Sequence, residues 1–147
     1  MATPFRVQIL TPEREVFAGE AVHLYARGSL GYLGVLAHHA PLLTSLEPGL
    51  MSVRLPDGSQ EHFVVTGGFL EVSNNRATVL ADAAEPASEI DAAAAEHALA
   101  EARGRLATPH LGPNGEAEID RERWEAQAEQ SAARLAVWKE YGSSASR

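Results

Sequence analysis

The chain has 147 residues, of which 45% are hydrophobic, and a formal net charge of −8 at pH 7. This composition allows a buried core, and the negative charge argues against nucleic acid as a partner, since a phosphate backbone favours a basic surface. The chain contains no cysteine, which excludes disulfides, thiolate metal sites and cysteine catalysis. No basic flank precedes an apolar core at the start, and no run approaches the ~20 apolar residues of a membrane helix. We therefore expect neither a secretory signal nor a membrane span.

The first 85 residues show the alternation that is typical of β-strands. Phe5, Val7 and Ile9 alternate with polar neighbours, which is a period of two. Turn signals at residues 56–58 and 74–75 separate further strands of the same kind. Roughly eight to ten short strands over about eighty residues predict an all-β sandwich of about ten strands.

The pair Gly67-Gly68 lies between two of these strands. No helix is predicted after it and no GxxxxGK pattern is present, so a phosphate-binding loop is disfavoured. We predict a bend or bulge where two backbones approach closely.

Composition changes near Glu85-Pro86, after which alanine, glutamate and arginine dominate. Ser88 with Asp91 three residues on predicts the N-cap of a first helix. Each of two helices then has one apolar face, formed by Ala95, Leu99, Ala102 and Leu106 and by Trp124, Ala128, Leu135 and Trp138. The residues Gly112 to Gly115 predict the loop between them. We expect a β-sandwich domain over residues 1–85 and an α-helical hairpin domain over residues 86–147, weakly held because alanine buries little apolar area.

The neighbouring histidines His38 and His39 are the most conspicuous candidates for chemistry. Adjacent side chains on a strand point to opposite faces, and no nearby acid completes a metal-binding set. We therefore predict turn histidines with a hydrogen-bonding role, no catalytic residue, no metal and no cofactor. Two alternatives remain open, a small metal-dependent β-barrel enzyme that uses His38 or His39 and a nucleotide sensor built on the hairpin.

Five motifs in this order and spacing identify a family: residues 31–36 (GYLGVL), 39–44 (HAPLLT), 48–49 (PG), 67–72 (GGFLEV) and 78–82 (TVLAD). From Phe5 to about Tyr141, the chain resembles the epsilon subunit of bacterial F-type ATP synthase. The resemblance implies a ten-stranded sandwich with a helical hairpin, without catalytic activity of its own. It implies a subunit that turns with the rotor and couples proton flow to ATP synthesis. The implied partners are the gamma subunit, the c-ring and the alpha3beta3 head. The implied location is the cytoplasmic face of the bacterial inner membrane, reached indirectly through the complex.

The resemblance also assigns candidate contact residues. Candidates for the gamma and c-ring interfaces are Gly31, Tyr32, His39, Pro41 and Leu42, and those for contact of the inhibitory hairpin with the beta subunit are Arg121, Arg123, Arg134 and Lys139. The chain departs from the family pattern at two places between residues 31 and 39. Tyr32 occupies a position that is often acidic in the family, and Ala37-His38 replaces the usual Pro-Gly.

Some family members bind ATP through a motif that opens the first helix. The corresponding stretch here is residues 90–95 (IDAAAA), in which Ala94 replaces the motif arginine. Only Asp91 and Arg134 match the ATP-binding set, so a phosphate partner is missing and we expect no tight ATP binding.

Overall fold

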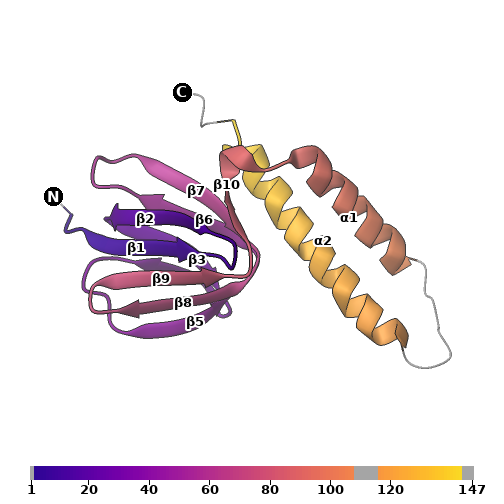
Figure 1. Ribbon diagram of the computed structural model, residues 1–147, viewed down its shortest axis with the longest axis horizontal. Helices are drawn as coiled ribbons and strands as arrows, with labels where there is room; N and C mark the ends of the chain where they lie inside the picture. The colour runs from indigo at the N-terminus through magenta and orange to yellow at the C-terminus, as the bar shows by residue number, and fades with distance from the viewer. Residues whose placement is uncertain (1, 108–115, 144–147) are drawn as a thin grey trace.

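The computed structural model describes residues 2–107 and 116–143 and contains ten strands, one short 3-10 helix and two α-helices (Figure 1). The elements are β1 (Phe5–Leu10), β2 (Glu15–Ala21), β3 (His23–Gly28), β4 (Gly31–Val35), β5 (Leu42–Leu46), β6 (Gly49–Arg54), β7 (Gln60–Val65), β8 (Gly68–Ser73), β9 (Arg76–Ala81), β10 (Ala84–Pro86), η1 (Ala87–Glu89), α1 (Ala92–Ala107) and α2 (Glu116–Tyr141). This confirms the predicted class, a β-sandwich followed by two helices.

The ten strands form one continuous sheet in the order β10-β7-β6-β3-β5-β8-β9-β1-β2, with β4 paired to β3. All pairings are antiparallel except that of β1 with β9. The sheet folds over on itself into two layers, and β10 at one end of the order contacts β2 at the other. The structure is therefore a sandwich that is nearly closed into a barrel.

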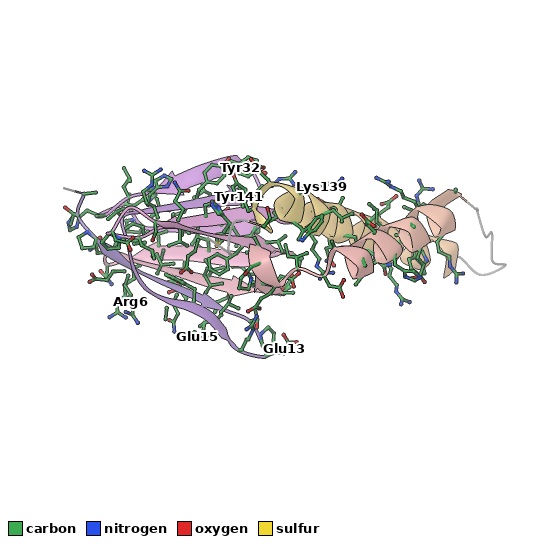
Figure 2. The ribbon with its side chains drawn as sticks, turned by 90° about the horizontal axis from the view of Figure 1, so that it is seen from above. Arg6, Glu13, Glu15, Tyr32, Lys139 and Tyr141 are labelled. Carbon is green, nitrogen blue, oxygen red and sulfur yellow. The ribbon has the colours of Figure 1, made fainter. Side chains whose placement is uncertain are left out.

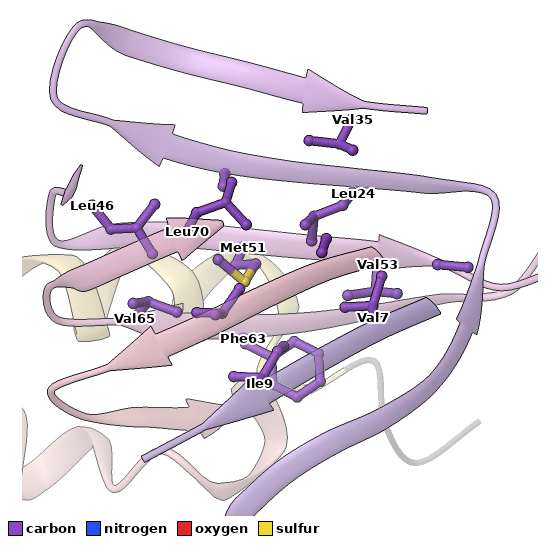
Figure 3. Close-up of a cluster of buried hydrophobic side chains, with 14 of the residues drawn as sticks. Val7, Ile9, Leu24, Val35, Leu46, Met51, Val53, Phe63, Val65 and Leu70 are labelled. Atoms are coloured by element: carbon purple, nitrogen blue, oxygen red, sulfur yellow. The ribbon is translucent and has the colours of Figure 1, made fainter. Parts of the chain in front are cut away.

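The core lies between the two layers and contains the alternating apolar residues predicted from the period of two. Phe5, Val7 and Ile9 are buried in one cluster with Phe63 of β7 and Leu70 of β8. Figure 3 shows Val7 and Ile9 among these side chains. Burial of such side chains contributes roughly 1.5–3 kcal/mol each, so this cluster is the main source of stability of the sandwich.

The strand connections confirm two predicted turns and the predicted close approach of two backbones. Asn74 and Asn75 adopt φ angles of 52° and 59° and join β8 to β9, as a tight hairpin turn requires. Gly58, with φ 89°, closes the turn between β6 and β7. Gly68 has φ 120°, and a methyl group on it would overlap the carbonyl oxygen of Leu80 on β9. The predicted close approach of two backbones therefore occurs at Gly68.

The start of the helical region differs from the sequence prediction. The N-cap of α1 is Asp91, whose Oδ1 accepts a hydrogen bond from the backbone N–H of Ala94 at 3.0 Å. Ser88 lies in η1 and is exposed. Ala87 and Ile90 on either side are buried, so packing ties this segment to the sandwich and delays the start of the helix until after Asp91.

The helices α1 and α2 pack side by side as an antiparallel hairpin that extends away from the sandwich (Figures 1 and 2). Ala95 and Ala102 are buried on the predicted face of α1, and Leu135 is buried on α2. Trp138, on the predicted apolar face of α2, is 39% exposed and so lies outside the buried core. The predicted loop at residues 112–115 lies outside the described residues.

Candidate interaction surfaces

The β3–β4 hairpin carries Gly31 and Tyr32 at its tip. Gly31 has φ 120°, and the preceding Leu30 is completely exposed. The Tyr32 ring stacks on Tyr25, with centroids 4.9 Å apart, and the Arg27 guanidinium lies 6.0 Å from the Tyr32 centroid. Tyr32 therefore offers an exposed aromatic surface at a position that is often acidic in the family that the chain resembles.

The histidines lie in the connection from β4 to β5. His38 has φ 60°, and its backbone N–H donates to Asn75 Oδ1 at 2.8 Å. Histidine tolerates this left-handed region better than most residues, so the turn forms without the family's Pro-Gly. The Nδ1 of His39 lies 2.6 Å from the carbonyl oxygen of Ala40. In residues 2–107 and 116–143, no group of three or more His, Asp or Glu side chains is arranged to hold a metal ion.

The five interface candidates of the sandwich form two groups at opposite ends of the strands. Gly31 pairs with Gly28, which also pairs with Leu46 at the end of β5. Leu42 begins β5, about 13 Å from Leu46 at the usual rise per residue, and lies next to Pro41 and His39. The structure therefore separates Gly31 and Tyr32 from His39, Pro41 and Leu42.

A third exposed surface was missed by the sequence reasoning. Leu43 of β5, Phe69 of β8 and Leu80 of β9 point outward from one sheet layer and are 70%, 55% and 53% exposed. Phe69 and Leu80 are direct cross-strand neighbours. We call these three residues the outer apolar row. The alternation along the strands could have revealed them, because Phe69 and Leu80 directly neighbour the core residues Leu70 and Val79 and so must point to the opposite face of the sheet.

The hairpin docks on the sandwich through the C-terminal end of α2. Val137 packs with Val64 of β7 and with Ala87 and Ile90 in a small second core. The Tyr141 ring stacks on His62 of β7, with centroids 3.8 Å apart and an interplanar angle of 17°. A pocket of about 330 Å³ lies beside this stack. We call the contacts of Val137 and Tyr141 with the sandwich the clasp.

His62 is the titratable group that the sandwich contributes to the clasp. Its Nδ1 lies 2.9 Å from Ser52 Oγ on β6. Burial lowers the pKa of His62 below its ordinary value of 6.5, and the negative charge of Glu140 opposes this by a smaller amount. Burial beneath Tyr141 therefore favours the neutral imidazole.

The four basic candidates of α2 have different surroundings. Arg121 Nε donates to Glu125 at 2.9 Å, and the Arg123 guanidinium lies 5.2 Å from the Trp124 centroid; both arginines are exposed. Lys139 is also exposed. Arg134 is different, because its Nε donates to Glu85 of β10 at 2.5 Å in a half-buried ion pair. Arg134 thus holds the hairpin to the sandwich.

The residues that match the ATP-binding set are occupied by contacts within the chain. Asp91 caps α1 and Arg134 binds Glu85, while Ala94 is exposed and offers no cation. Across the described part of the chain, neither helix has the length and apolar character needed to cross a bilayer.

Comparisons with known proteins agree with this fold. The β-sandwich domain of the ATP synthase delta/epsilon chain matches residues 4–87. An ATP synthase epsilon chain of Pelotomaculum thermopropionicum is 52% identical over 102 residues, which are 69% of this chain and 75% of the relative. Another, from Dichelobacter nodosus, is 39% identical over 121 residues, 82% of each chain. A chain of the Euglena gracilis mitochondrial ATP synthase OSCP/F1/c-ring structure has a TM-score of 0.75 at 24% identity, covering 90% of this chain and 80% of its own.

Proposed function

The chain belongs to the ATP synthase delta/epsilon family, and we propose that it is the epsilon subunit of a rotor central stalk. In this role it couples proton translocation to ATP synthesis and catalyses no reaction itself. The observation that carries the proposal is the 52% identity to an ATP synthase epsilon chain over 69% of the chain. The complex holds the subunit at the cytoplasmic face of the bacterial inner membrane as a peripheral component.

The sandwich is the part that the rotor grips. The tip with Gly31 and Tyr32 and the opposite end with His39, Pro41 and Leu42 contact the gamma subunit and the c-ring. Support comes from the exposure of Leu30 and Tyr32 and from the outer apolar row, since contiguous exposed apolar side chains mark protein interfaces. Because two ends of one rigid sandwich are engaged, torque passes through the subunit without deforming it.

The hairpin acts as an inhibitory arm on ATP hydrolysis by the alpha3beta3 head. Arg121, Arg123 and Lys139 are available on its surface for the beta subunit, and release of Glu85 frees Arg134 as a fourth contact. Support for release comes from the small clasp and the alanine-rich α1–α2 contact, which bury little apolar area. The arm does not bind ATP tightly, because Ala94 supplies no phosphate partner.

Co-expression with the gamma subunit tests the stalk role. We expect one complex in gel filtration and no ATP hydrolysis by the isolated chain, and two separate peaks would refute the role. Assembled enzyme that lacks residues 89–147 is expected to hydrolyse ATP faster than the enzyme with the full chain. An unchanged rate would refute the inhibitory arm while leaving the stalk role in place.

A further inference from the structure

The parallel pairing of β1 with β9 sorts the outward side chains by chemistry. Three cross-strand pairs point outward, namely Arg6 with Arg76, Gln8 with Thr78, and Leu10 with Leu80. The surface therefore changes from basic to polar to apolar along the strands. Its apolar end is continuous with the outer apolar row through Leu80.

The basic end places two like charges side by side. Neighbouring strands lie about 4.8 Å apart, and like charges directly opposite each other destabilise a sheet. In the described part of the chain, no ion pair joins Arg6 or Arg76 to a carboxylate, although Glu20 is the register partner of Arg6 on β2. Figure 2 shows Arg6 pointing away from the sheet. In a chain of net charge −8, two adjacent arginines that form no ion pair within the described residues are a feature that intramolecular stability does not explain.

The space between these arginines suits an anion. A depression of about 440 Å³ is lined by Arg6, Gln8, Arg76, Ala77 and Thr78. The two guanidinium groups are the charged donors of the depression, and the neutral Gln8 amide already donates to Glu15. Guanidinium groups bind carboxylates with directed, paired hydrogen bonds.

We propose that Arg6 and Arg76 together bind an acidic side chain of the protein partner that covers the outer apolar row. Leu80 lies about 13 Å from Arg76 along β9, so a single protein surface spans both ends. This continuity with an exposed apolar surface favours a protein carboxylate over a free phosphate. The inference rests on the proposed function and assigns the gamma subunit as the partner that covers the outer apolar row.

The test measures binding of the full chain to the gamma subunit by titration calorimetry. We expect Arg6→Gln and Arg76→Gln each to weaken binding about tenfold, and the double variant to weaken it by much less than a hundredfold, since both arginines hold one carboxylate. The effect should shrink at about 0.5 M salt. Arg54→Gln, an exposed arginine on β6, is the matched control for charge and should change affinity less than twofold. The melting temperature of the free chain should stay constant or rise in Arg76→Gln, because a like-charge repulsion is removed.

Several results would overturn the proposal. Equal weakening by Arg6→Gln, Arg76→Gln and Arg54→Gln indicates a general charge effect. Loss of binding on Phe69→Asp with unchanged affinity in both arginine variants leaves the stalk role intact but removes the carboxylate site. Stabilisation of the native chain by millimolar inorganic phosphate, absent in the double variant, assigns the site to a free anion instead. Failure of the native chain to bind gamma refutes the proposed function itself.

Discussion

At the scale of single residues, Gly68 illustrates how a backbone contact determines a side chain. Gly68 and Gly31 share a φ of 120°, but a methyl group meets β9 at Gly68 and nothing within 4 Å at Gly31. We predict that Gly31→Ala costs about 1–2 kcal/mol from backbone strain, whereas Gly68→Ala costs about 4 kcal/mol or more because β8 and β9 must separate. Thermal unfolding of the two variants provides the comparison. Equal losses would show that strain, and not the close approach, makes Gly68 necessary.

His62 gives the clasp a pH dependence whose sign follows from its lowered pKa. Burial lowers the pKa of His62 when Tyr141 covers it, so docking is favoured above pH 6.5 and weakens as the pH falls through 6.5 toward the lowered pKa. We predict that the hairpin opens more often at pH 5.5 than at pH 7.5, and that His62→Phe, which keeps the stacking, removes this dependence. The chain has no cysteine, so labels attached to Ala18→Cys on β2 and Ala132→Cys on α2 report the distance between the sandwich and the hairpin. A distance independent of pH in the otherwise native chain would contradict the role of His62.

At the scale of elements, the docking of α2 on the sandwich is expected to depend on one of two adjacent residues that differ in exposure. Val137 is buried in the clasp and Trp138 is largely exposed. Val137→Ala removes two buried methyl groups, so we predict a loss of about 1–2 kcal/mol of docking free energy, with a larger effect on docking than the bigger truncation Trp138→Ala. Hydrogen exchange of the amides in β7 and η1 measures docking without requiring the helix to unfold. Faster exchange of these amides in Trp138→Ala than in Val137→Ala would contradict the prediction, because Trp138 would then make the main docking contact.

At the scale of the whole molecule, we propose that residues 1–85 fold independently and that residues 86–147 depend on them. The main core is built from strands β1 to β9, whereas the second core is small and shared with α2. We predict that a chain ending at Ser88 keeps a β-type circular dichroism spectrum and unfolds cooperatively, at a lower temperature because Val64 loses its cover. The full chain melted under the same conditions is the control. A spectrum without β signal would disprove the independence of the sandwich.

The features predictable from the sequence were those determined by local chemistry. The turn at Asn74-Asn75 and the bend at Gly68 follow from backbone conformations that few residues adopt. The cap at Asp91 was misplaced to Ser88, because both residues are good caps and tertiary packing of Ala87 and Ile90 decides between them. Local preference alone does not contain that packing.

The interaction surfaces were less predictable for a related reason. The motifs located Tyr32 and His39, but only the strand register shows that they lie at opposite ends of the sandwich. The outer apolar row likewise joins residues from three strands, and so does not exist as a pattern within any one stretch of sequence. Pairing of distant segments supplies this information.

The parallel pairing of β1 with β9 has a consequence for synthesis of the chain. Strand β1 can form a hairpin with β2 as soon as both leave the ribosome, but its other edge stays open until Ala81 has emerged. Non-local closure of this kind is slow, and an open edge invites association with other chains. This edge of the nascent sandwich therefore stays open until nearly all of its strands have been made, and only β10 and η1 separate the closing strand β9 from the helices.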